Sequence, residues 1–138
     1  MIGILLLAQE DIGRGLIRAA ENTYSRRIVL IDALTVDCNR KPERTAEEIA
    51  RKIEELDQGE GVLILADLYG ASHTNMACRF LKRGRIELIA GVNLPMLLRV
   101  LNYRDLKMDD LIDKALGGGC GGIVCAGASS QLSKEAGS

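Results

Sequence analysis

Residues 62–81 read VLILADLYGASHTNMACRFL, in which an apolar run meets a polar loop and then a helical pattern. The five apolar residues Val62 to Ala66 have the length of a strand, and Asp67 stands where they end. Gly70 allows a turn, and Ser72 to Leu81 places its apolar side chains on one helical face. A strand, a loop and a helix in this order form the repeating unit of an α/β protein.

The same alternation extends in both directions along the chain. Four further apolar runs read as strands: Ile2 to Leu7, Ile28 to Leu34, Ile86 to Ala90 and Ile123 to Ala126. Helical patterns cover Ile12 to Tyr24, Ala46 to Leu56, Met96 to Leu101 and Asp109 to Leu116. Because the runs are continuously apolar, we expect strands covered on both faces. The fold prediction is a single doubly wound, mostly parallel five-stranded sheet with helices on both faces.

Several residues predict where the helices begin and end. Thr45 followed by Glu48 has the spacing of a capping box, which favours a helix starting after Thr45. Pro95 suits the first turn of a helix, where its missing N–H would have no partner. The glycines at 117–119 are expected to end the last helix, and the run up to Gly122 to serve as a flexible hinge.

Length and composition indicate one domain. The 138 residues are 47% hydrophobic, enough for one continuous core. We expect this domain to occupy residues 1–128. The Ser-, Ala- and Gly-rich end, with residues 129–138 at its tip, is expected to be disordered.

The charge balance excludes several classes of partner. A net charge of −1 gives no electrostatic footprint for nucleic acid or an anionic membrane, and no apolar run is long enough for direct membrane insertion. No signal-peptide pattern is present at Met1, so we expect a cytoplasmic protein. The four cysteines form no CxxC pair and have no neighbouring His, which predicts free, mostly buried thiols, no metal site and no cofactor.

The candidate site follows from the parallel sheet. Ligands bind such sheets at the carboxyl ends of the strands, here the loops at residues 8–13, 67–75 and 91–95. Asp67 can orient an imidazole or accept a proton. The loop that it opens can face an anion such as phosphate, through Gly70, Ser72, Thr74 and Asn75.

Two structural alternatives stay open at this loop. Asp67 and Ser72 can simply cap the helix while Gly70 makes the turn. His73 is the chain's single histidine, and it is either a catalytic side chain or a solvated or capping residue of a helix start.

A family resemblance emerges from three quoted segments. MIGILL at 1–6, LADLYGAS at 65–72 with Asn75, and GVNLPMLL at 91–98 resemble the mannose/fructose-family enzyme IIA component of the sugar phosphotransferase system, and KALGGG at 114–119 also matches. The resemblance implies a domain that takes a phosphoryl group on a histidine from the phosphocarrier protein and passes it to a IIB-type component. Asp67 matches the aspartate that steadies this histidine, and Ser72 matches a hydroxyl residue of the pocket.

The chain departs from that pattern at the phosphorylated residue. Superimposing the strands places Gln9 at the histidine position, and Glu10 and Asp11 add negative charge beside it. An amide nitrogen is not nucleophilic because its lone pair is delocalised, so Gln9 should not be phosphorylated. We therefore expect a phosphotransfer-deficient, regulatory or binding form. The alternatives are an active relay through His73 oriented by Asp67, and an unrelated anion-binding α/β domain.

The resemblance also implies an oligomeric state. Relatives form homodimers in which the C-terminal strand pairs with the other subunit. Ile123 to Ala126, after its glycine run, is the matching segment, so a homodimer with an exchanged strand is expected.

Overall fold

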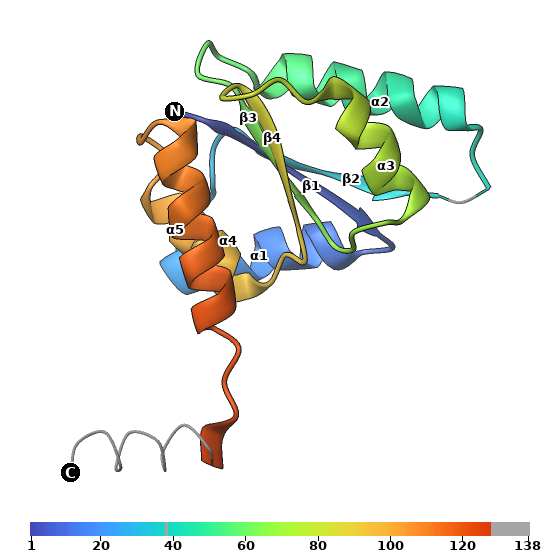
Figure 1. The fold of residues 1–138 in the computed structure, drawn as a ribbon. Coiled ribbons are helices and arrows are strands. Elements are labelled where there is room, and N and C mark those ends of the chain that lie inside the picture. The colour runs from blue at the N-terminus through green and yellow to red at the C-terminus, as the bar shows by residue number, and fades with distance from the viewer. Residues whose placement is uncertain (38, 128–138) are drawn as a thin grey trace.

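The computed structural model describes residues 1–37 and 39–127. Strands and helices alternate along the chain (Figure 1). Their bounds are β1 Gly3–Gln9, α1 Ile12–Tyr24, β2 Ile31–Val36, α2 Pro42–Leu56, β3 Val62–Ala66, α3 Ser72–Ala77, a 3-10 turn at Cys78–Phe80, β4 Ile86–Ala90, α4 Leu94–Asn102 and α5 Met108–Gly121.

The four strands form one parallel sheet in the order β2-β1-β3-β4. In its register Leu6 lies beside Ala33 on one side and beside Leu65 on the other, and Leu65 lies beside Ile89. The predicted parallel arrangement is therefore confirmed. Since the strands all run the same way, their carboxyl ends meet at one edge of the sheet.

Helices cover both faces of the sheet, as the doubly wound prediction requires. Helices α1, α4 and α5 lie on one face, and α2 and α3 on the other (Figure 1). Each face has its own apolar core because side chains alternate along a strand: Leu6 and Leu65 belong to the first core, Leu5 and Ile64 to the second. All of β3 is buried, as its continuous apolar run predicted.

The predicted fifth strand is not part of the sheet. Among the described residues the sheet has four strands, and the segment from Ile123 to Cys125 has no regular structure. The side chains of Ile123 and Val124 are 77% and 59% exposed. An apolar run forms a strand only beside a neighbour, and this segment leads away from the sheet, as the red end of the ribbon shows. The predicted tail at 129–138 lies outside the described residues.

Two predicted helix boundaries are wrong. Helix α2 begins at Pro42, with Lys41 as its N-cap, so Thr45 lies inside the helix and its hydroxyl faces the Lys41 carbonyl at 3.5 Å. Helix α5 continues through the glycines to Gly121. Gly118 explains this continuation: a Cβ there would lie 2.6 Å from the Cβ of Arg99, so glycine lets α5 pack directly on α4.

The described cysteines also differ from the prediction. Cys78, Cys120 and Cys125 are free, as expected, but all three are exposed rather than buried. Cys78 lies in the 3-10 turn, Cys120 in the last turn of α5 and Cys125 beyond that helix, all outside the two cores. Within residues 1–37 and 39–127, every helix is too short or too polar to span a membrane.

A buried arginine holds the amino ends of β1 and β2. The guanidinium of Arg104 donates to the Ile2 carbonyl from Nε at 3.0 Å and Nη2 at 2.9 Å, and to the carbonyls of Val29 and Leu30. Burial lowers the pKa of Arg104 to about 10, so the group keeps its charge at neutral pH. The Leu30 carbonyl also accepts the Ile4 N–H at 3.1 Å, so Arg104 adds charged donors to backbone carbonyls at the amino ends of both strands.

Candidate functional site

A cavity of about 620 Å³ lies at the carboxyl edge of the sheet. Loops that follow three strands line it. The lining residues are Gln9 and Glu10 after β1, Thr35, Val36, Asp37, Asn39 and Arg40 at and after β2, and Ala71, Ser72 and His73 after β3. This is the edge where parallel sheets bind ligands, as the sequence predicted.

Asp67 joins two of these loops. One carboxylate oxygen accepts the backbone N–H of Gln9 at 2.9 Å, and the other lies 2.8 Å from Nε2 of His73. The structure thus brings Gln9, Asp67 and His73 together, although 58 residues separate the first two in sequence.

The environment of Asp67 favours its charged form. Burial alone would raise the pKa of this carboxyl group. Hydrogen bonds from the Gln9 N–H and from the His73 ring lower the pKa, as does the charge that the ring can carry. These contributions outweigh burial, so the pKa of Asp67 is lowered overall. An ionised carboxylate only accepts hydrogen bonds, so Nε2 of His73 must carry the proton between them. In the uncharged ring, Nδ1 then holds the lone pair.

His73 is neither solvated nor a helix cap. Its side chain is 5% exposed, and the residue lines the cavity. The N-cap of α3 is Ala71, and no side chain caps this helix, so the capping interpretation of Asp67 and Ser72 is wrong. The physical reason is that the Asp67 carboxylate is already engaged by the Gln9 N–H and the His73 ring.

The remaining loop residues have separate roles. Gly70 takes φ +85, the left-handed conformation that the expected turn requires. The hydroxyl of buried Thr74 donates to the Leu68 carbonyl, and the Asn75 amide lies 3.5 Å from the Gly70 carbonyl. Of the four residues predicted to form a phosphate loop, Ser72 lines the cavity, whereas Thr74 and Asn75 stabilise the loop itself.

The β1–α1 loop is fixed in an unusual conformation. Glu10 has φ 47, which is uncommon for a residue with a side chain, and its carbonyl accepts the Thr35 hydroxyl at 3.1 Å. Gln9 and Glu10 are both exposed at the edge of the cavity. The main chain after β1 is therefore held by Asp67 and Thr35, while the side chains of Gln9 and Glu10 bond to no other residue in the part of the chain that the structure describes.

The sequence reasoning missed the contribution of the β2–α2 loop. Asp37, Asn39 and Arg40 line the cavity, and the Arg40 guanidinium binds both carboxylate oxygens of Glu48, at 2.6 and 2.7 Å. The rule that selects loops after parallel strands would have found this loop if applied to the strand at 28–34. That strand's predicted end lies two residues before the real one.

The loop at 91–95 lies outside this cavity. The side-chain oxygen Oδ1 of Asn93 accepts the Met96 N–H at 2.9 Å, and its side-chain nitrogen Nδ2 donates to the Gly119 carbonyl at 3.1 Å. Asn93 therefore caps α4 and attaches it to α5. An asparagine after a strand can donate into a pocket or start a helix, and Asn93 starts a helix.

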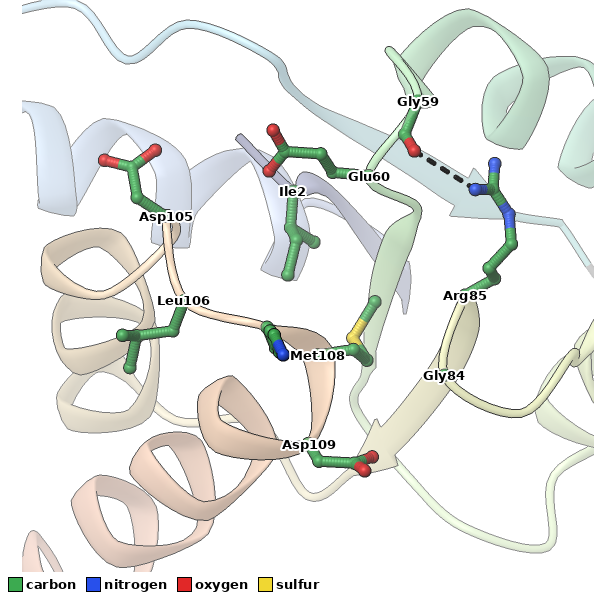
Figure 2. A pocket seen from close by; sticks show the side chains of 10 residues that line it. Ile2, Gly59, Glu60, Gly84, Arg85, Asp105, Leu106, Met108 and Asp109 are labelled. Carbon is green, nitrogen blue, oxygen red and sulfur yellow. Dashed lines mark hydrogen bonds between the residues drawn. The ribbon is translucent and has the colours of Figure 1, made fainter.

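A second cavity, of about 570 Å³, lies at the opposite edge, beside the amino ends of the strands (Figure 2). Ile2, Leu106 and Met108 are its apolar lining residues, and the acidic residues Glu60, Asp105 and Asp109 come from different segments. Arg85 donates to the Gly59 carbonyl at 3.1 Å and pairs with Asp57 at 2.7 Å. This second cavity lies at the amino ends of the strands, and parallel sheets bind their ligands at the carboxyl ends, so it is the less favoured ligand site. Among the described residues no cluster of side chains is arranged to hold a metal ion.

These features define an open α/β domain with a polar site at the carboxyl edge of its parallel sheet. The family model described as the PTS system fructose IIA component matches residues 3–116. The chain therefore belongs to the mannose/fructose family of IIA components of the sugar phosphotransferase system, as its sequence resemblance indicated. This assignment replaces the alternative of an unrelated anion-binding domain.

Individual relatives give the same family. The chain is 37% identical over 84 residues to the PTS system mannose-specific EIIAB component of Escherichia coli K12, and 35% identical over 69 residues to the PTS system fructose-specific EIIA component of Bacillus subtilis 168. These matches cover 59% and 49% of this chain but only 26% and 47% of the relatives. The fold matches EIIA from Streptococcus agalactiae with a TM-score of 0.81 at 21% identity, covering 93% of this chain and 99% of that one.

Proposed function

We propose that this chain is a IIA-type domain that binds components of the phosphotransfer chain without itself accepting a phosphoryl group. One observation carries the proposal: the exposed side chain at the end of β1 is Gln9, while the chain's single histidine is 5% exposed and bound to Asp67. The domain would then act as a regulatory or binding form, in the cytoplasm where such chains operate.

The chemistry of transfer supports this proposal. In phosphoryl transfer the attacking atom, the phosphorus and the leaving atom lie nearly on one line, so the accepting nucleophile must be directly accessible to the donor. The Gln9 amide is exposed but not nucleophilic. The His73 imidazole is a possible nucleophile, but its side chain is only 5% exposed, so little of the ring is accessible to a phosphohistidine on a partner protein.

Charge at the cavity gives further support. Glu10 and Asp37 line the cavity, and the Arg40 guanidinium there is neutralised by Glu48. An incoming phosphoryl group would therefore meet carboxylates and no unpaired guanidinium among the described residues of the cavity lining.

A second candidate function rests on the His73 geometry. The ring lines the same cavity as Gln9 and is oriented by Asp67 at 2.8 Å, which would leave Nδ1 as the attacking atom of a displaced relay. If the loop opened, His73 would take the phosphoryl group and Asp67 would hold the ring in the required tautomer.

The partners follow from the family. We propose that the domain binds the phosphocarrier protein and a IIB-type component through the loops around the cavity. We also propose a homodimer, because Ile123 and Val124 are exposed beyond α5 and β4 is an edge strand able to accept another strand. Light scattering tests this: a monomeric mass at micromolar concentration would contradict it.

Whether the chain accepts a phosphoryl group is tested by its intact mass after incubation with phosphoenolpyruvate, enzyme I and the phosphocarrier protein. Wild type should stay unmodified. Gain of one phosphoryl group by Gln9→His would show that the missing imidazole alone prevents transfer, whereas an unmodified Gln9→His would show that the carboxylates of the cavity prevent it as well. Labelling of wild type that disappears in His73→Ala would establish the relay instead. Labelling of wild type that persists in His73→Ala would contradict both candidates.

A further inference from the structure

We propose that the cavity at the carboxyl edge binds a cation, the side chain of a lysine or arginine on a partner protein, at the place where an active IIA domain takes a phosphoryl group. This inference rests on the proposed function, since a site that accepts phosphoryl groups would not favour a cation. The inference states which kind of ligand the cavity binds when residue 9 is glutamine.

The first support is the buried His73 ring, which lines the cavity. His73 is 95% enclosed, and Asp67 holds the proton on Nε2, so in the uncharged ring Nδ1 is an acceptor. Among the described residues Nδ1 has no hydrogen-bond partner, and it is not one of the fully buried atoms, since every such atom has a partner. A ligand that donates hydrogen bonds would satisfy it, whereas a phosphate oxygen would face its lone pair.

The second support is the charge of the cavity lining. Glu10 and Asp37 carry carboxylates with no ion-pair partner among the described residues. Arg40 is the one guanidinium of the lining, and Glu48 binds it through both oxygens. The net field at the cavity is therefore negative, which attracts an ammonium or guanidinium group.

The third support concerns the source of the cation. The loops that line the cavity also carry exposed apolar side chains: Leu68 and Tyr69 in the β3–α3 loop, and Ile12 at the start of α1. Tyr69 is 76% exposed. Apolar and aromatic side chains around a charged recess are typical of a surface that docks a protein, in which one inserted side chain acts as an anchor. A free small amine would use the recess but not this surrounding surface.

The test is a titration of the ¹⁵N-labelled full chain followed by NMR, at constant ionic strength and about pH 8. The probes are n-butylammonium, methylguanidinium, inorganic phosphate and the capped peptides acetyl-Gly-Lys-Gly-amide and acetyl-Gly-Arg-Gly-amide. The cations and peptides should shift the amides of the cavity loops, phosphate should not, and a capped peptide should bind more tightly than the bare cation.

Matched variants assign the effect to the cavity. Glu10→Gln and Asp37→Asn should each weaken binding of the cations about fivefold, the factor that follows from one charge at roughly 4 Å in water. Asp113→Asn, an exposed acid on α5, is the control and should leave binding unchanged.

Three outcomes would overturn the inference. They are tighter binding of phosphate than of any cation, no shift by any cation up to about 0.1 M, and equal binding in wild type and both cavity variants. Binding of n-butylammonium as tight as that of the lysine peptide would overturn the protein source. Wild type that stays unphosphorylated yet prefers phosphate refutes this inference alone, whereas phosphorylated wild type refutes the proposed function.

Discussion

Replacing Asp67 by asparagine should loosen both loops that the carboxylate joins. The change keeps the size of the side chain but removes its charge and one of its two acceptor oxygens. Asp67 accepts the Gln9 N–H at 2.9 Å and bonds the His73 ring at 2.8 Å. The asparagine oxygen can still accept the Gln9 N–H, but its amide N–H then faces Nε2 of His73, which accepts it only if the ring proton moves to Nδ1.

The expected loss follows from removal of the negative charge, to which both hydrogen bonds are now made. A hydrogen bond to a charged group contributes about 1.5–3 kcal/mol, so Asp67→Asn should lower the free energy of unfolding by about 2 kcal/mol. For a chain of this length that corresponds to a fall in Tm of roughly 8 °C. In the His73→Ala background the same change should cost about 1 kcal/mol less, because the bond between the two side chains is already absent.

The difference in stability between wild type and Asp67→Asn should depend on pH. The pKa of Asp67 is lowered in the folded chain, so its stabilisation is fully present above the unfolded value of about 3.9 and is lost as pH falls through the folded value. The stability gap between wild type and Asp67→Asn should therefore be constant near neutrality and close below about pH 4.

Urea unfolding from neutral to acid pH measures this gap, with Asp113→Asn as the control for loss of an exposed carboxylate. A gap below about 0.5 kcal/mol at neutral pH, or one that widens on acidification, would refute the assigned role of Asp67.

Other predictions concern parts of the chain away from the carboxylate. Arg104→Met should lower the free energy of unfolding by about 3 kcal/mol in urea, since the loss of four charged bonds outweighs the relief of burying a cation; a change under 1 kcal/mol would contradict this. Gly61→Ala should cost about 3 kcal/mol in the same assay, because its φ is +93 and a Cβ would lie 2.1 Å from the Arg85 carbonyl oxygen. Glu10→Gly should raise the free energy of unfolding by about 0.5–1 kcal/mol, and with it Tm, because glycine adopts the positive φ of this position without strain. A lower Tm would show that the Glu10 side chain stabilises the loop.

The sheet could be predicted because its strands are encoded locally. Val62 to Ala66 is buried on both faces, so its continuous apolar run has one interpretation. The run at Ile123 carries the same local signal, but a strand needs a neighbour, and no pattern within the run says whether one is available. The prediction that glycines end α5 was wrong for a related reason. The close contact between α5 and α4 overrides the low helix propensity of glycine, and the sequence of α5 alone gives no sign of this contact.

The site could be predicted in part. The carboxyl-edge rule located the loops, and Asp67 was selected because it ends a strand. The bond between Asp67 and His73 could not be foreseen, because it depends on the turn that Gly70 makes with φ +85 and on burial of a ring from a helix start that looks polar in sequence. The pairing of Arg40 with Glu48 was missed because Glu48 was interpreted as part of a capping box.

The bond between Asp67 and residue 9 has a consequence for how this site can change over evolution. Asp67 holds the main-chain N–H of Gln9 and makes no bond to its side chain among the described residues. Every amino acid except proline offers that N–H, so position 9 can exchange its chemistry while the loop keeps its anchor. A nucleophile could therefore be lost, or regained, at this position in a single step without dismantling the architecture around it.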